Sequence, residues 1–346
     1  MQSVSASVPV IKISGSWLEM GRQYARQAEP YLLHISDYID CHLADDSLRK
    51  SNVEKIADKL FDSFPDYLQT FMQGMAEVSQ LNLDSLKKVN AIEYIIFDFG
   101  CSSLAAGRAY TVDSKLIFGR NYDYPVMKPL NQDMVVTVFH PTSGKSFATI
   151  GYAGEIYAVN GINEDGLFVE LNNGSPSAGY TGFFDRQPVT TLLVELLMQA
   201  SNTAEAEFFL RNHPADEAYI IGLADPFEAR TCEYCRSGLR RGDISQPNGL
   251  AIAANHFINN DWPYMTPDDE HSWNSITRTC NMLQLAELHK GHIYINLMKT
   301  LMSTPVEDGG PFHDLTVYQL VVIPQERAFH LRVIDANNWN FILPFA

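Results

Sequence analysis

Long hydrophobic runs are absent from this chain, and basic residues are scarce. No apolar stretch reaches the roughly 18 residues that a membrane-spanning helix needs. Residues 1–6 lack both the basic start and the continuous apolar segment of a secretory signal. The 25 basic residues against 41 acidic ones give a net charge of −16. Such an acidic surface repels nucleic acid and anionic membrane, which argues against both as partners, and we expect a cytoplasmic protein.

Cysteine is scarce as well. The 5 cysteines are an odd and scattered set, which argues against a disulfide framework. Cys232 and Cys235 lie three apart in an expected strand, where their side chains would face opposite sides and form no metal-binding pair. The dinucleotide fingerprint and the phosphate loop are both missing. We therefore expect neither a metal nor a cofactor.

The 346 residues do contain enough apolar material for a large core, with 46% hydrophobic and 11% aromatic content, which excludes general disorder. Apolar periodicity predicts helices in the front part of the chain at 17–42, 52–60, 67–79 and 85–97. Short alternating segments then predict strands, beginning at 109–112 and 116–120. Later helices are expected at 188–200, at 204–211 with Thr203 as its cap, and at 275–288. This order predicts an α+β protein with antiparallel sheets.

The stretch from Gly100 to Asp123 is the most suggestive of chemistry. A catalytic thiol needs a base, because its reference pKa is about 8.5. Cleavage of the Gly100–Cys101 bond would give Cys101 its own base, the new α-amine, with a reference pKa of about 7.7 to 8. Asp123 could then hold that amine, Arg120 could keep the thiol region positive, and Tyr122 fits a strand with one face toward the site. A buried structural cysteine followed by an ordinary strand explains these residues equally well.

Three further places carry polar side chains at expected element ends. Asn172 and Asn173 close a strand, and an asparagine amide in an active site is worth about 3 kcal/mol as an oxyanion donor. An Asn-Asn-Gly run is nevertheless more often only a turn. Asn255 and His256 close another strand, and Arg278 opens a helix that could fold back over the site. Each of these signals is weak by itself.

Taken together, these segments resemble the N-terminal-nucleophile amidohydrolases. The similarity is greatest to the isopenicillin N acyltransferase branch, and choloylglycine hydrolase and acid ceramidase are more distant. The matching motifs follow the family's order along nearly the whole chain, at 14–23, Gly100–Cys101, 119–123, 163–167 and 255–257. Each motif is modest evidence, and their shared order makes the resemblance strong.

The resemblance implies a four-layer αββα sandwich with two antiparallel sheets. Residues 1–100 would form a largely helical segment that is retained as an α chain after self-cleavage. Residues 101–346 would form the catalytic β chain, and the two together would make one structural domain.

The resemblance also assigns roles to residues. Cys101 would be the nucleophile, with Arg120 and Asp123 positioning it. Either Asn172 or Asn173 would hold the oxyanion, and the family pattern favours Asn172. The remaining assignments are Asn255 as a further pocket residue, and Arg278, His256 and Tyr122 as substrate or structural residues.

The implied activity is cleavage of a linear amide C–N bond through an acyl-enzyme. Two alternatives stay open: acyl transfer to an amine at the same site, and an unprocessed binding protein of the same fold. The expected partner is a small-molecule amide with an apolar acyl group, which the aromatic stretches 152–157 and 180–184 would suit, although aromatic residues there are more often core. A homo-oligomer is compatible with these expectations.

Overall fold

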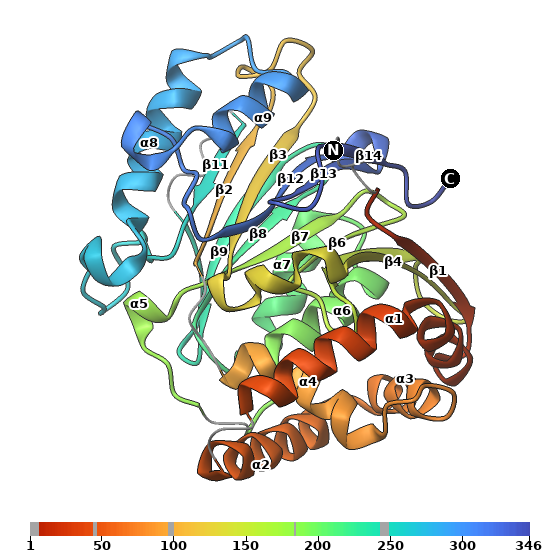
Figure 1. Ribbon diagram of the computed structural model, residues 1–346. Helices are drawn as coiled ribbons and strands as arrows, with labels where there is room; N and C mark the ends of the chain where they lie inside the picture. The colour runs from red at the N-terminus through yellow and green to blue at the C-terminus, as the bar shows by residue number, and fades with distance from the viewer. Residues whose placement is uncertain (1–6, 44–46, 96–99, 183–184, 243–248) are drawn as a thin grey trace, which may run out of the picture.

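The structure is a computed structural model, and it describes residues 7–43, 47–95, 100–182, 185–242 and 249–346 (Figure 1). The front of the chain is helical, as the sequence predicts, with α1 (Trp17–Leu43), α2 (Ser47–Ser63), α3 (Asp66–Ala76) and α4 (Leu83–Ile95). The helix expected to reach residue 97 is described only as far as Ile95, because residues 96–99 lie outside the described residues.

Helices α1 and α3 touch backbone to backbone through two glycines. A Cβ added to Gly21 would lie 2.0 Å from the Phe71 carbonyl oxygen, and one added to Gly74 would lie 2.3 Å from the Leu18 carbonyl oxygen. Any larger residue would therefore push the two helices apart. Gly21, which belongs to the motif at 14–23, thus serves helix packing.

The first sheet has eight strands in the order β1-β4-β5-β6-β7-β8-β9-β10. Its strands are β1 (Val10–Gly15), β4 (Met134–Pro141), β5 (Phe147–Tyr152), β6 (Asn160–Asn163), β7 (Phe168–Asn173), β8 (Tyr219–Ala224), β9 (Ala229–Cys235) and β10 (Gly238–Arg241). All neighbouring strands pair antiparallel except β1 and β4, which run parallel with Val10 opposite Val136. The long connection between these two strands permits the parallel pair.

The second sheet has six strands in the order β11-β2-β3-β12-β13-β14, and all its neighbours are antiparallel. Its strands are β11 (Leu250–Ala253), β2 (Gly100–Ala106), β3 (Ile117–Asp123), β12 (Thr316–Ile323), β13 (Ala328–Val333) and β14 (Asn340–Ile342). Residues of β2 contact β7 across the space between the two sheets. The catalytic candidate Cys101 therefore lies where the sheets meet.

Helices cover the outer face of each sheet (Figure 1). On the second sheet these are α8 (Ser275–Leu288) and α9 (Ile295–Ser303), which pack on β2, β11, β3 and β12. On the first sheet, α6 (Val189–Gln199) and α7 (Thr203–Arg211) join the front helices. The remaining short elements are α5 (Ser175–Ala178), η1 (Pro125–Asp133), η2 (Glu270–Ser272), η3 (Val306–Asp308) and η4 (Pro324–Glu326). The expected four-layer α+β sandwich is confirmed, with the single parallel pair as its exception.

Several local expectations are wrong for identifiable reasons. Strand β2 is missing from the prediction because its cysteine, serine and alanine side chains are small and carry little strand preference. The strand expected at 109–112 is only an isolated bridge between Thr111 and Ile293. Asn202, and not Thr203, caps α7, because its side chain accepts the Glu205 N–H at 3.0 Å. The edge strands β10 and β14 are too short to stand out in the sequence.

All five cysteines are free thiols, in agreement with the expected absence of a disulfide framework. Within the described part of the chain, none of the helices has both the length and the apolar character that crossing a bilayer requires.

Asp216 is a buried carboxyl group that should make stability depend on pH. Its Oδ1 accepts the N–H of Val189 at the start of α6 at 3.1 Å. Burial is the main cause that raises its pKa to about 7, and neighbouring Glu217 raises it further. Because the folded pKa lies above the ordinary value of 3.8, the folded protein holds the proton more tightly. Its stabilising contribution is full at acidic pH and is lost as pH rises through 7.

Asp216→Asn keeps an oxygen acceptor for Val189 and removes the charge. At pH 8 we expect the variant to be more stable than wild type by on the order of 3 kcal/mol, with little difference near pH 4. Urea unfolding at the two pH values measures this difference. The exposed Asp308→Asn variant should show no such change with pH, and an equal Asp216→Asn effect at both pH values would contradict the assignment.

Candidate active site

The thiol of Cys101 is enclosed between the two sheets. Cys101 is the second residue of β2 and is fully buried. Its Sγ lies 3.4 Å from Nη2 of Arg120 and 3.7 Å from the carbonyl oxygen of Leu171. Burial raises the pKa of this thiol to about 12, although Arg120 opposes that shift. A thiol in this environment is protonated at neutral pH and requires a base before it can attack.

Pairing between β2 and β3 sets which side chains share the thiol's face. Cys101 lies opposite Tyr122, and Ser103 lies opposite Arg120. Side chains of directly paired residues project to the same face, so Arg120 and Cys101 both point toward the first sheet. The fully buried Arg120 guanidinium donates to the Leu171 carbonyl at 2.8 Å.

Glu170 balances the charge of Arg120, and sequence reasoning missed its role. Its carboxylate is fully buried and forms an ion pair with Arg120. It also accepts hydrogen bonds from Ser103 Oγ at 2.8 Å and from Asn172 Nδ2 at 3.2 Å. The available signal was an acidic residue in an otherwise apolar strand, two positions before Asn172 and therefore on the same face.

The main chain of Cys101 is held by a second polar cluster beside α8. Its N–H donates to Asn255 Oδ1 at 3.0 Å, and its carbonyl oxygen accepts from Arg278 Nη1 at 3.0 Å. Arg278 also reaches Asn255 Oδ1 at 2.7 Å and Asp123 Oδ2 at 2.9 Å. Thr316 Oγ1 donates to the other Asp123 oxygen at 2.7 Å. The nitrogen of Cys101 therefore lies beside polar groups that could hold an amine.

Asp123 and Arg120 act on opposite sides of the strand that carries them. They are three residues apart in β3, so Asp123 turns toward Arg278 while Arg120 turns toward the thiol. Arg278 is fully buried, and burial lowers its pKa while Asp123 opposes the shift. The site thus holds the thiol with one cluster and the main-chain nitrogen with another.

The two neighbouring asparagines of β7 are separated by strand alternation. Asn172 Oδ1 accepts from Arg120 Nη1 at 3.3 Å, which places its amide in the thiol cluster. Asn173 Oδ1 instead accepts the Ser175 N–H at 2.9 Å. The Asn173 carbonyl accepts from Asn255 Nδ2 at 2.9 Å, so its main chain belongs to the second cluster.

His256 is linked to the second cluster through Ser275, and Tyr122 lies beside Arg120. Ser275 Oγ lies 2.7 Å from His256 Nδ1 and accepts the Asn255 N–H at 2.7 Å, and burial lowers the pKa of His256. Tyr122 lies with its ring centre 5.5 Å from the Arg120 guanidinium carbon and stacks on Tyr318 at 4.8 Å. The structure therefore places Arg120 beside the thiol of Cys101, and Asn255 and Arg278 at its main chain. The side chains of Asn173 and His256 instead contact Ser175 and Ser275.

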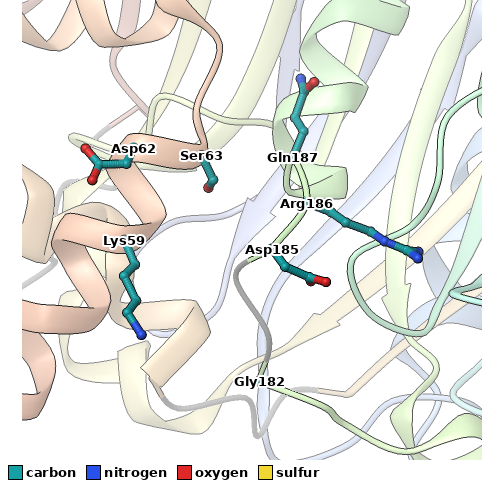
Figure 2. Close-up of a pocket in the computed structure, with 7 residues that line it drawn as sticks. All are labelled: Lys59, Asp62, Ser63, Gly182, Asp185, Arg186 and Gln187. Atoms are coloured by element: carbon teal, nitrogen blue, oxygen red, sulfur yellow. The ribbon is translucent and has the colours of Figure 1, made fainter.

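A cavity of about 600 Å³ lies elsewhere, between α2 and the segment before α6. Figure 2 shows Lys59, Asp62 and Ser63 on the helix side, and Asp185, Arg186 and Gln187 across from them. Its lining shares no residue with the two clusters around Cys101. This charged hollow is therefore separate from the candidate reaction centre.

The aromatic stretches expected to suit an acyl group are mainly structural. Tyr152 and Tyr157 are buried in the core. Tyr180 is 43% exposed and donates to the Tyr94 carbonyl at 2.9 Å. Residues 183–184 lie outside the described residues.

Stacked sheets flanked by helices, with a cysteine nucleophile candidate at the start of a strand, agree with the N-terminal-nucleophile class that the sequence resembles. The chain belongs to the acyl-coenzyme A:6-aminopenicillanic acid acyl-transferase family, because the sequence model of that family matches residues 111–301, more than half of its length. The expected family is therefore confirmed.

Comparison with curated proteins finds no match. Among solved structures, a Caenorhabditis elegans N-acylethanolamine-hydrolyzing acid amidase ortholog is 18% identical, with 68% of this chain and 95% of that chain covered and a TM-score of 0.49. A conjugated bile acid hydrolase mutant from Clostridium perfringens is 15% identical, with 70% and 92% covered and a TM-score of 0.46. Penicillin V acylase from Agrobacterium tumefaciens is 11% identical, with 70% and 86% covered and a TM-score of 0.41.

Proposed function

We propose that this chain cleaves its own Gly100–Cys101 bond and then hydrolyses linear amides with Cys101 as the nucleophile. The observation that carries the proposal is that polar groups contact both the thiol and the main-chain nitrogen of Cys101. Its thiol lies 3.4 Å from Arg120 Nη2, while its nitrogen lies 3.0 Å from Asn255 Oδ1 in a separate cluster. A purely structural cysteine has no need of polar groups around both atoms.

Self-cleavage begins when Sγ attacks the carbonyl carbon of Gly100. A carbon–sulfur bond forms, the Gly100–Cys101 C–N bond breaks, and the thiol proton goes to the departing nitrogen. Water then attacks the thioester and the carbon–sulfur bond breaks, which releases the Gly100 carboxylate. One proton of the water returns to the sulfur and the other goes to solvent. The product is an α-amine beside Asn255 and Asp123, in the position now held by the main-chain N–H.

Turnover uses that amine as the base. It takes the thiol proton as Sγ attacks the amide carbonyl of the substrate, and it returns the proton to the leaving amine. The resulting acyl-enzyme is hydrolysed by water. Arg120 stabilises the thiolate in its low-dielectric setting, and Asn172 is the favoured donor to the oxyanion.

Residues 1–100 are proposed to remain as the α chain within the same structural domain as residues 101–346. The pairing of β1 with β4 and the packing of α1 on the first sheet support this retention. The substrate is proposed to be a small amide with an apolar acyl group. A family named for an acyl-transferase also supports acyl transfer to an amine acceptor as the second activity.

A panel of linear amides, tested with and without hydroxylamine as an acceptor, checks the reaction. We expect carboxylic acid as the product in water and some hydroxamate when hydroxylamine is present, because both attack the same acyl-enzyme. Hydroxamate without any acid would favour the acyltransferase. A wild-type protein that binds the amides and turns over none of them would support the non-catalytic alternative.

The two asparagines of β7 should respond differently to substitution. Asn172→Ala should lower kcat by about 10²- to 10³-fold with a small change in KM, because the lost donor acts in the transition state. Asn173→Ala removes the side chain that accepts the Ser175 N–H and should mainly lower stability. Steady-state kinetics and thermal unfolding of both variants measure these effects, and a larger kcat loss for Asn173→Ala would assign the oxyanion to Asn173.

A further inference from the structure

The residue before the nucleophile shows where an acyl group must fit. In the proposed self-cleavage, Gly100 is the first acyl group that Cys101 accepts, so its Cα marks the position of the carbon next to the reacting carbonyl. The surroundings of Gly100 therefore describe the acyl subsite at that carbon. This reasoning rests on the proposed function.

Gly100 is buried and closely surrounded. A Cβ built on it would lie 3.4 Å from each of three atoms, Asn255 Oδ1, Asp123 Oδ2 and Trp273 Cβ. These are the shortest of ordinary contact distances, so one methyl group fits in contact with all three atoms, and any larger substituent would have to extend past them. Asn255 accepts the Cys101 N–H and Asp123 accepts from Arg278, which leaves Trp273 as the wall of the subsite that belongs to neither cluster.

The backbone conformation at Trp273 holds its side chain beside Gly100. Trp273 and Asn274 both adopt the left-handed conformation, with φ of 52° and 56°. Residues that carry a Cβ disfavour this conformation, and two in succession need support from their surroundings. The support comes from Asp269, whose carbonyl accepts the Asn274 N–H at 2.9 Å.

Asp269 also fixes the start of the helix that follows. Its carboxylate accepts from Ile276 N at 2.7 Å and from Thr277 Oγ1 at 2.6 Å. That same first turn carries Ser275 and Arg278, which hold Asn255 and Cys101. The left-handed turn at 273–274 therefore positions both Trp273 beside Gly100 and the residues of α8 that hold Asn255 and Cys101.

We infer that Trp273 determines acyl specificity by limiting the bulk next to the reacting carbonyl. The substrate class is linear amides whose acyl group is unbranched, or carries at most a methyl group, at that carbon. Acyl groups with larger substituents at the same carbon meet Trp273 and are rejected.

Self-cleavage tests this inference without a known substrate. We expect Gly100→Val to cleave at least about 10-fold more slowly than Gly100→Ala. Gly100 has no left-handed φ, so neither replacement strains its backbone. Adding Trp273→Gly to Gly100→Val should restore most of the rate, because glycine removes the wall and tolerates the left-handed turn.

Trp339→Ala in the Gly100→Val background is the matched control, since Trp339 packs beside Lys299 and not beside Gly100. This double variant should remain slow. Rapid cleavage of Gly100→Val, or no recovery with Trp273→Gly, would overturn the inference while leaving wild-type cleavage intact. A wild-type chain that never cleaves would instead remove the proposed function itself.

A second readout uses substrates and separates specificity from folding. Amides of hexanoic acid and 2-ethylhexanoic acid with one amine are compared by kcat/KM in wild type and Trp273→Gly. The unbranched to branched ratio should fall at least about 10-fold in the variant. A ratio unchanged by Trp273→Gly in an active enzyme would contradict the role of Trp273.

Discussion

Replacing Cys101 with alanine should leave the chain uncut and abolish turnover. The variant lacks the only sulfur that lies beside Arg120 in the described site, so neither the thioester of self-cleavage nor the acyl-enzyme can form. We expect turnover to fall by at least about 10³-fold, to the limit of detection. Denaturing electrophoresis measures the cleavage, and release of amine from a linear amide measures the turnover.

The matched control is Cys232→Ala, which removes another fully buried thiol that lies in β9, away from the site. This control should keep both cleavage and turnover. A Cys101→Ala protein that still turns over amides would remove Cys101 from the mechanism. A Cys101→Ala protein that still cleaves at residue 100 would show that an external protease makes the cut.

Replacing Glu170 with glutamine should cost about 3–5 kcal/mol in the free energy of unfolding, because it leaves the Arg120 guanidinium buried without its partner charge. Turnover should fall as well, since Arg120 would no longer be held beside the thiol. Urea unfolding and amide hydrolysis measure the two effects. The exposed Glu307→Gln variant is the control and should change neither.

A double variant separates the effect of the Arg120–Glu170 ion pair on folding from its effect on turnover. Replacing both Arg120 and Glu170 with methionine removes both buried charges and fills similar space, so most of the lost stability should return. Turnover should stay low, because the guanidinium that contacts the sulfur is then missing. A Glu170→Gln protein within about 1 kcal/mol of wild type would show that the ion pair has little effect on the fold.

The local parts of the site could be predicted from the sequence. The Gly100–Cys101 dipeptide and the Arg120 and Asp123 pair lie on consecutive paired strands, so a short motif already contains their relationship. Helix α8 is predicted with its observed bounds, yet the role of Arg278 is not evident there. Two of its partners, Cys101 and Asp123, lie more than a hundred residues earlier in the chain.

Contacts between the sheets could not be predicted. Glu170 on β7 meets Arg120 on β3 only because the two sheets stack across the core, where β7 contacts β2, the neighbour of β3. A single sequence does not show which strands stack. That Arg120 and Asp123 point to opposite faces can be predicted only when both are known to lie in one strand, because side chains alternate between the two faces along a strand. Strand β2 is not predicted because its residues are mostly small, which suits their buried position but gives no strand preference in the sequence.

The mass of the denatured, catalytically active wild-type protein tests the central claim most directly. The account predicts two species, residues 1–100 and residues 101–346, with a free α-amine on Cys101. A single intact chain in a fully active preparation would contradict it, because the nucleophile would then work without the base that the proposed mechanism requires.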